Sequence, residues 1–181
     1  MSRVIINSRK TLLKTKLFSV DALDVHFGNK KDVFHGIKVK PAGMIIALTE
    51  KHEIYLTEQY RYLQKREYLE IPAGMIEDNE EPMAAAKREL EEEIGLGAKN
   101  WRSLVELDMA SGIMEWPLYY FLATDLYQMK QKLDPSEALT IVRIPLKVAI
   151  DKIYSGEIMK QSSVTGILLI ESLLQKGKLN L

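Results

Sequence analysis

The stretch that decides how this chain folds is residues 74–96, GMIEDNEEPMAAAKRELEEEIGL. Pro82 suits the first turn of a helix, where its missing N–H costs nothing. Gly95 suits the residue just past a helix end, where a left-handed conformation is needed. Good helix formers fill the interval, so we predict a helix between these two residues. At ~100° per residue, four apolar side chains share one face of it: Met83, Ala86, Leu90 and Ile94.

The same helix carries its acidic residues at the unfavourable end. Glu89, Glu92 and Glu93 lie beside the apolar face, whereas Glu91 points elsewhere. Carboxylates near a helix C-terminus oppose the macrodipole by ~0.3–1 kcal/mol each, and like charges four residues apart also repel. A hard divalent cation such as Mg²⁺, which takes oxygen ligands, would offset this cost. The alternative interpretation is an ordinary solvated acidic face.

The spacing of the stretch matches every fixed position of the Nudix box: Gly74, Glu80, Arg88-Glu89-Leu90, Glu92-Glu93 and Gly95-Leu96. The chain therefore resembles a Nudix hydrolase. This resemblance implies a loop–helix–loop motif that binds Mg²⁺ or Mn²⁺. It also implies hydrolysis of a nucleoside diphosphate linked to a further group.

Carried over by position, the resemblance implies a role for each residue of the box. The implied metal ligands are the carbonyl of Ala73, the carboxylates of Glu89 and Glu93, and Glu92 as a ligand or support. Arg88 is expected to orient the glutamates. Arg88 and Glu92 are therefore candidate catalytic residues. Gly74 and Glu80 are expected to be structural.

Two residues ahead of the box are candidates for binding the substrate. Residues 53–61, EIYLTEQYR, alternate as a strand and end in Arg61. Nudix proteins that act on ADP-ribose and nucleotide sugars carry a similar Gln-Tyr-Arg, whose arginine contacts the diphosphate. A planar guanidinium suits phosphate oxygens, although many strand-end arginines are merely solvated. Residues 70–74 also resemble this subgroup, whose members carry a similar Glu-x-Pro-Ala-Gly run before the box. The resemblance implies that Glu70 contacts the substrate or lies next to the metal site.

Two loops after the box bear on specificity and on the general base. Many ADP-ribose hydrolases carry Ser-Pro-Gly where this chain has Ala110-Ser111-Gly112. Gly112 stays a candidate substrate contact, but the departure weakens the assignment to ADP-ribose in particular. In the subgroup the general base lies in a loop shortly before the last strand, which makes Glu137 the candidate here. The alternatives are that Glu137 is an exposed loop residue and that Glu92 is the base.

The composition narrows the remaining classes. The 181 residues are 46% hydrophobic and 28% charged with zero formal net charge, which predicts one globular domain with a sizeable core. Neutrality and the absence of a basic, aromatic-rich run argue against nucleic acid as a partner. Zero cysteines exclude disulfides and thiolate catalysis, and they fit a cytoplasmic protein. No apolar run approaches the ~18 residues of a membrane span.

Alternation and turn residues predict the other elements. Residues 12–20, 23–27 and 33–39 are expected to form an antiparallel N-terminal sheet, with a turn at 28–30. Further strands are expected at 43–49, 53–61, 101–109, 117–123 and 138–146, followed by a helix at 147–154 and a last helix capped by Ser162 or Ser163. With the resemblance, this implies an α+β Nudix fold, a mixed β-sheet sandwiched between helices. Residues 1–181 are one expected domain, with 1–40 as an N-terminal extension and 41–181 as the catalytic core.

The expected function is a Mg²⁺-dependent pyrophosphohydrolase, with Mn²⁺ as a possible substitute. It would cleave ADP-ribose or a nucleoside diphosphate sugar to a nucleoside monophosphate and a sugar phosphate. One alternative is a hydrolase of nucleoside triphosphates or dinucleoside polyphosphates, and another is a non-catalytic ligand-binding module. Dimers that exchange N-terminal strands are common in the resembled subgroup, and unpaired strand edges invite association, so a homodimer is expected.

Overall fold

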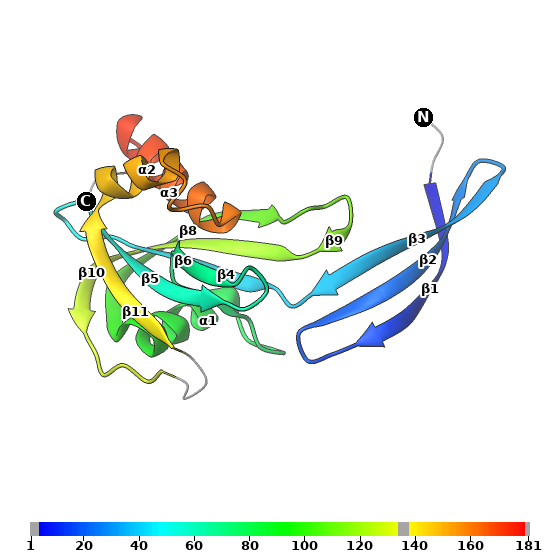
Figure 1. The fold of residues 1–181 in the computed structure, drawn as a ribbon, viewed down its shortest axis with the longest axis horizontal. Helices are drawn as coiled ribbons and strands as arrows, with labels where there is room; N and C mark the ends of the chain where they lie inside the picture. The colour runs from blue at the N-terminus through cyan, green and yellow to red at the C-terminus, as the bar shows by residue number, and fades with distance from the viewer. Residues whose placement is uncertain (1–3, 134–137, 180–181) are drawn as a thin grey trace. The chain divides into compact units, whose positions relative to one another are not determined.

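The computed structural model describes residues 4–133 and 138–179 (Figure 1). Its backbone divides into two compact units. Unit 1 comprises Met1–Ala42 and Glu106–Leu118, and unit 2 comprises Gly43–Val105 and Tyr119–Leu181.

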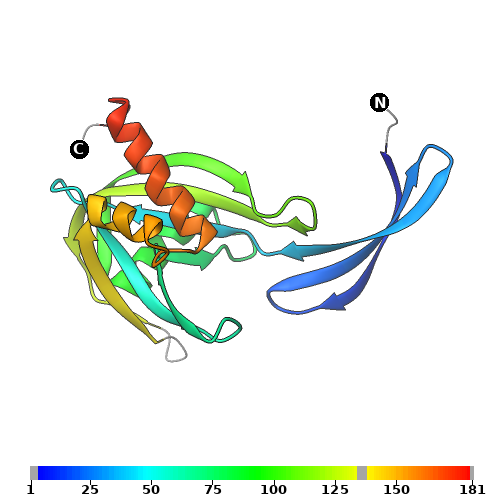
Figure 2. The same ribbon diagram turned by 45° about the horizontal axis from the view of Figure 1, so that its top comes forward.

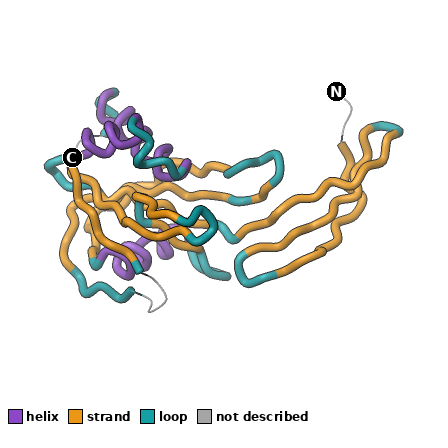
Figure 3. The backbone as a smooth tube through the Cα atoms, viewed as in Figure 1, coloured by secondary structure: helices purple, strands orange, loops and turns teal. Residues whose placement is uncertain are grey.

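Unit 1 is built on one four-stranded sheet in the order β1-β2-β3-β9. Its strands are β1 (Val4–Lys14), β2 (Phe18–Phe27), β3 (Lys30–Val39) and β9 (Met114–Glu115). The first three pair antiparallel, and β9 pairs parallel to β3. The described part of Met1–Ala42 contains strands and loops only (Figure 3). The expected N-terminal antiparallel sheet is therefore present.

The first strand differs from the expectation, because residues 12–20 do not form one strand. The chain turns between Lys14 and Phe18, and the side chain of Thr15 organises this turn. Its hydroxyl donates to the carbonyl of Phe18 and accepts from the backbone N–H groups of Leu17 and Phe18, at 3.0–3.1 Å. A threonine inside an alternating run thus ended a strand, since its hydroxyl can replace backbone partners.

A buried carboxylate ties the strands of unit 1 together. Asp21 on β2 accepts hydrogen bonds from Arg9 Nε (2.9 Å) and Thr11 Oγ1 (2.7 Å), both on β1. Arg9 also contacts Glu115 on β9 at 3.3 Å, and Lys38 on β3 pairs with Glu115 at 2.7 Å. The hydrogen bonds from Thr11 and Arg9 hold the pKa of Asp21 below its usual value. One polar chain therefore spans all four strands.

Unit 2 contains two sheets and the helices. One sheet has the order β7-β4-β10-β8, and the other has the order β11-β5-β6. The strands are β4 (Ala42–Ala47), β5 (Glu53–Arg61), β6 (Arg66–Glu70), β7 (Ala73–Met75), β8 (Leu96–Asp108), β10 (Pro117–Gln128) and β11 (Leu139–Pro145). One end of β4, of β8 and of β10 belongs to unit 1. The helices are α1 (Pro82–Glu89) with a π-helical turn η1 (Leu90–Ile94), then α2 (Leu146–Tyr154) and α3 (Gln161–Gln175).

The fully buried strand β4 shows how helices cover both faces of the first sheet. Ile45 and Ala47 join a buried cluster with Leu90 and other residues of α1 and η1. The intervening Ile46 faces the other way, toward Gly166 of α3. Figure 1 shows α2 and α3 on one side of the unit 2 strands and α1 on the other, and Figure 2 shows the orange and red helices α2 and α3 lying across these strands. The expected α+β fold, with a sheet sandwiched between helices, is confirmed.

Several element boundaries in unit 2 differ from the sequence-based expectations, most of all those of β8, β10 and α3. Strands β8 and β10 are longer than the runs predicted at 101–109 and 117–123, since β8 already begins at Leu96 and β10 continues to Gln128. Helix α3 begins at Gln161 with Lys160 as its N-cap, not with Ser162 or Ser163. The Ser163 hydroxyl instead accepts the backbone N–H of Ile71 at 3.1 Å. Within the described residues, no helix is long and apolar enough to cross a membrane.

Candidate active site

The helix expected between Pro82 and Gly95 is present, and its ends are those expected. Pro82 occupies the first turn, and Gly95 adopts a left-handed φ of 66° just after Ile94. Ala86, Leu90 and Ile94 are buried in the core of unit 2, with Met83 packed against them. The apolar face therefore fixes the helix to the sheet and leaves the acidic residues beside it. The helix ends in a π-helical turn, a local widening that often occurs at functional sites.

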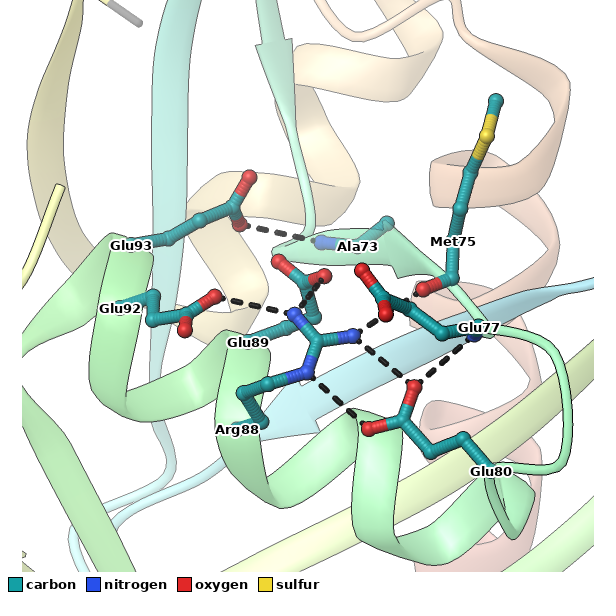
Figure 4. Close-up of polar contacts among 8 residues, drawn as sticks. All are labelled: Ala73, Met75, Glu77, Glu80, Arg88, Glu89, Glu92 and Glu93. Carbon is teal, nitrogen blue, oxygen red and sulfur yellow. Dashed lines mark hydrogen bonds and ion pairs between the residues drawn. The ribbon is translucent and has the colours of Figure 1, made fainter. Parts of the chain in front are cut away.

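Arg88 links the carboxylates of this helix and its preceding loop (Figure 4). Its Nε and Nη2 donate to the two oxygens of Glu80, at 3.0 and 3.1 Å. Its Nη1 donates to Glu89 Oε1 at 2.6 Å and to Glu92 Oε2 at 3.0 Å. Nη2 also donates to the carbonyl of Met75 at 3.1 Å. One guanidinium thus connects three carboxylates and the end of β7. We use the name acidic cluster for Arg88, these three glutamates (Glu80, Glu89 and Glu92) and the neighbouring Glu93.

Arg88 and Glu80 stabilise each other's charged forms. The hydrogen bond to Glu80 is the main cause that raises the pKa of Arg88 above its usual value. The same bond lowers the pKa of Glu80, which also accepts the backbone N–H of Glu77 at 2.9 Å. Three carboxylates around one guanidinium still carry an excess of negative charge. Arg88 therefore orients these glutamates without neutralising them.

The remaining box residues supply hard oxygen donors next to one another. The buried carboxylate of Glu93 accepts the backbone N–H of Ala73 at 3.1 Å. The carboxylate of Glu89 lies against Gly74 so closely that a Cβ there would fall 1.8 Å from its Cδ. A side chain at Gly74 would therefore displace Glu89. Ala73 and Gly74 are consecutive, so Glu89 and Glu93 both reach the start of β7.

The oxygen atoms of these residues are the kind of ligand that a hard divalent cation binds. Carboxylate and carbonyl oxygens are the ligands that Mg²⁺ prefers. In the described residues, no three acidic or histidine side chains are already gathered as a metal site. Glu89 and Glu92 instead turn toward Arg88, and Glu93 turns toward the Ala73 N–H.

The last residue of β10 and the segment that follows it contact the C-terminal end of the same helix. The amide of Gln131 donates to the carbonyl of Glu93 at 2.7 Å, and that of Gln128 donates to the carbonyl of Gly95 at 2.9 Å. Lys132 pairs with Glu91 at 2.6 Å, and its backbone N–H donates to the carbonyl of Glu92. Donors and a cation placed at the negative end of a helix offset the unfavourable charge there. The sequence contains no local signal for this contact.

A second charged cluster lies at the end of β6. Glu70 is 1% exposed, and Arg61 donates to its two oxygens from Nε at 2.7 Å and from Nη2 at 2.5 Å. Lys160, the N-cap of α3, pairs with the same carboxylate. Burial raises the pKa of Glu70, but the hydrogen bonds and charges of Arg61 and Lys160 outweigh it and lower that pKa. We call these three residues the Glu70 cluster.

The predicted site residues fall into three groups. The described structure brings together Ala73, Arg88, Glu89, Glu92 and Glu93, and it pairs Arg61 with Glu70. Gly112 belongs to unit 1, in the turn where Ile113 N–H donates to the carbonyl of Ala110. Glu137 lies outside the described residues. Sequence reasoning missed Lys160, which is 90 residues from Glu70 in the chain and belongs to no motif.

The chain is similar to several known proteins. The NUDIX domain family model matches residues 38–158. An ADP-ribose pyrophosphatase from Bacillus subtilis (strain 168) is 29% identical over 82% of this chain and 85% of its own length. The ADP compounds hydrolase NudE from Escherichia coli (strain K12) is 28% identical over 92% of this chain and 90% of its own length.

A solved structure is similar over nearly the whole chain. A crystal structure of an ADP compounds hydrolase has a TM-score of 0.87 and 27% sequence identity, and the match covers 99% of this chain and 97% of that one. Nudix pyrophosphatases generally need a divalent metal, which agrees with the donor types found here. The family model, the complete box and the sandwiched sheet lead to one conclusion: the chain belongs to the Nudix domain family.

Proposed function

We propose that this protein is a metal-dependent pyrophosphohydrolase that cleaves the diphosphate of ADP-ribose or of a nucleoside diphosphate sugar. The products would be a nucleoside monophosphate and a sugar phosphate. The names of the relatives support this substrate class. The observation that carries the proposal is that one unit bears both the acidic cluster around Arg88 and the Glu70 cluster with its two cations, Arg61 and Lys160. A metal-bound diphosphate needs both kinds of charge.

The proposed metal is Mg²⁺, with Mn²⁺ as a substitute, and the proposed ligands are the carbonyl of Ala73 and the carboxylates of Glu89, Glu92 and Glu93. Bound there, the metal would neutralise phosphate oxygens and lower the pKa of the attacking water. Arg88 would keep Glu89 and Glu92 near each other through its two Nη1 contacts. The Gly74 backbone leaves the space that the Glu89 carboxylate occupies.

Arg61, Glu70 and Gly112 are the proposed substrate-binding residues. Arg61 would contact the diphosphate, and Glu70 would fix the orientation of its guanidinium through two hydrogen bonds. Removing the charged Arg61 side chain should raise KM by about tenfold to a hundredfold, the usual value of a charge-assisted bond. Unchanged kinetics of Arg61→Ala would make Arg61 a surface residue.

The proposed general base is Glu137, with Glu92 as the alternative. Glu137→Gln should lower kcat by about 10²–10⁴-fold while KM and metal affinity stay unchanged, because only proton removal in the transition state is lost. Glu92→Gln is the paired comparison, with metal titrations and kcat against pH for both. A loss of less than about tenfold in Glu137→Gln, below the usual range for a general base, would move the role to Glu92.

The function is tested by assaying the purified protein with Mg²⁺ on a panel of substrates. The panel contains ADP-ribose, nucleotide sugars, dinucleoside polyphosphates and nucleoside triphosphates, with products separated by chromatography. We expect a nucleoside monophosphate and a sugar phosphate from the first two classes, and no turnover with a chelator. Turnover of the last two classes alone would contradict the proposal. Tight binding without turnover would indicate a ligand-binding module.

We also propose that the chain acts as a cytoplasmic homodimer and that residues 1–40 extend a catalytic core of residues 41–181 within one domain. Zero cysteines support the compartment. Large exposed apolar side chains on β1 to β3 support the dimer: Val4, Ile5, Ile6, Leu12, Leu13, Phe27, Val33 and Phe34. Strand β1 also ends the sheet order, so one of its edges is available for pairing.

The dimer is tested by light scattering at micromolar concentration. Ile5→Lys combined with Leu13→Lys should give a monomer, since charges on an apolar interface oppose its burial. The matched control is Leu63→Lys, which changes an exposed leucine of unit 2. A wild-type monomer with full activity would contradict this proposal and leave the proposed reaction unaffected.

A further inference from the structure

The Glu70 cluster contains one more cation than its carboxylate needs. Arg61 already donates two hydrogen bonds to Glu70, which is the complete bidentate pairing of a guanidinium with a carboxylate. Lys160 adds a second cation on Glu70 Oε2. Because the pKa of Glu70 is lowered, its carboxylate is ionised at neutral pH. Two cations and one anion give the cluster a net charge of about +1.

Placing a second cation beside a buried carboxylate costs folding free energy, so stability alone does not explain it. Removing a charge from water costs free energy, and a carboxylate that is already paired gains little further electrostatic stabilisation from a second cation. The cost is reduced here because both cations keep contact with solvent: the Arg61 side chain is 39% exposed and that of Lys160 is 29% exposed, against 2% for Glu70. The negative charge is thus buried, and the positive charges are at the surface of the cluster.

The backbone on both sides of the cluster is fixed. Ile71, next to Glu70, donates its N–H to Ser163 Oγ in the first turn of α3. Tyr120 donates its hydroxyl to the carbonyl of Ser162 at 3.1 Å. Gly166 lets α3 pack closely on Ile71, since a Cβ there would lie 3.1 Å from its Cδ1. Lys160, at the N-cap of this helix, is therefore positioned relative to Glu70 before any ligand binds.

The cluster is also close in the chain to the proposed metal ligands. Glu70 lies three residues before Ala73, whose N–H donates to the carboxylate of Glu93. An anion bound at the acidic cluster through a metal would need neutralising charge on its other oxygens. We propose that Lys160 is a second cationic contact for the substrate's diphosphate, oriented by Glu70 together with Arg61. This inference rests on the proposed function and adds a binding residue to it.

The contact uses the chemistry of an ammonium group. Lys160 carries three N–H donors, and the bond to Glu70 takes one of them. A phosphate oxygen can accept another while Glu70 keeps the side chain in place. Such a contact acts on the bound diphosphate in the ground state and the transition state alike. Its loss should therefore raise KM and change kcat little.

The test measures binding of inorganic pyrophosphate in excess Mg²⁺ by calorimetry. Lys160→Gln removes the charge but keeps an amide that can donate to Glu70, and Lys160→Arg restores a cation. The matched control is Lys152→Gln, because Lys152 is also 29% exposed and also pairs with a glutamate, Glu157. We expect pyrophosphate to bind about tenfold to a hundredfold more weakly to Lys160→Gln, as for loss of a charge-assisted bond. Lys160→Arg should recover most of the affinity, and the control should match the wild type.

A second measurement uses the wild-type chain and does not depend on the folding of a variant. Mild acetylation of lysines, read by mass spectrometry, should slow at Lys160 when pyrophosphate and Mg²⁺ are added, and should not slow at Lys152. Unchanged acetylation of Lys160, unchanged pyrophosphate affinity of Lys160→Gln, or no pyrophosphate binding by the wild type would each overturn the inference. A lower melting temperature of Lys160→Gln with normal affinity would mean a structural role only and would overturn it as well.

The probe separates this inference from the proposed function. Pyrophosphate contains neither the sugar nor the base, so its affinity reports on the diphosphate contact alone. A wild type that fails to hydrolyse ADP-ribose and nucleotide sugars would contradict the function. A wild type that hydrolyses them while Lys160→Gln shows normal KM and normal pyrophosphate affinity would contradict only the role of Lys160.

Discussion

The acidic cluster and the Glu70 cluster lie in the same unit of a protein with zero formal net charge, but the ratio of cations to carboxylates is reversed between them. In the acidic cluster one cation, Arg88, connects three carboxylates. In the Glu70 cluster one carboxylate pairs with two cations, Arg61 and Lys160. The first carries surplus negative charge and the second surplus positive charge. Each central residue holds oppositely charged side chains in place around it.

The difference between the clusters also lies in burial. Glu70 is buried and both of its partners are more exposed, so removing its charge would leave two cations beside a buried site without a counter-charge. Arg88 is about one-third exposed, as is Glu92, so water shares in solvating their charges. The Glu70 cluster should therefore matter more for stability. The acidic cluster should matter more for activity.

The largest expected effect is the loss of stability in Glu70→Gln. Two cations would be left without their buried counter-charge, and breaking such a pair typically costs about 3–5 kcal/mol. We expect about 3 kcal/mol by urea unfolding at pH 7, the low end of this range, since both cations reach solvent. Because folding lowers the pKa of Glu70, its contribution is present above pH 4.5 and is lost as pH falls further. Glu157→Gln, which removes an exposed partner of Lys152, should leave stability unchanged. Equal stability of both variants would mean that the Glu70 pairing contributes nothing.

The second effect concerns activity and the acidic cluster. Glu93→Gln keeps an oxygen that can accept the Ala73 N–H but removes a proposed metal ligand. We expect kcat/KM to fall by at least about a hundredfold, comparable to losing a residue that supports a metal site. The control is Glu91→Gln in the same turn, whose partner is Lys132 and which should stay within about twofold of wild type. Full Mg²⁺-dependent activity in Glu93→Gln would contradict the ligand assignment.

A smaller effect tests the anchoring of the helix that carries Lys160. Tyr120→Phe removes the hydrogen bond to the carbonyl of Ser162 and should cost about 1 kcal/mol at pH 7. Burial raises the pKa of Tyr120 to about 12 from 10.0, so the folded state favours the neutral phenol. Its contribution is complete below pH 10 and is lost as pH rises toward 12. The stability gap between wild type and variant should therefore narrow above pH 10. Tyr154→Phe, at an exposed position, is the control, and a constant gap would contradict the burial argument.

The smallest expected effect is a gain in stability, whereas removing a paired charge usually lowers stability. Glu92→Gln should raise the stability of the metal-free protein by a few tenths of a kcal/mol, because it removes one of several like charges at a negative helix end. Thermal unfolding with and without Mg²⁺ measures this. Added Mg²⁺ should stabilise the wild type more than the variant, since only binding to the folded state shifts the equilibrium. A destabilised metal-free variant would show that the Arg88–Glu92 pair outweighs the repulsion.

The acidic cluster could be predicted because it is local. Its residues lie on one helix and the loop before it, so residue spacing alone places Arg88, Glu89, Glu92 and Glu93 near one another. Pro82 and Gly95 fix the helix ends for conformational reasons that hold in any protein. The threonine turn at Thr15 was missed because a hydroxyl that caps a turn looks like any polar residue in an alternating run.

The sequence by itself determined the family, the helix of the box and the order of the main elements, because each depends on residues close together in the chain. Only the tertiary structure decided which distant groups meet: Lys160 and Glu70, Ser163 and Ile71, and Gln131 with the end of the helix. These contacts are 38 to 92 residues apart. Their partners are ordinary polar residues with no local pattern, and they meet because the packing of α3 and of the segment after β10 brings them together.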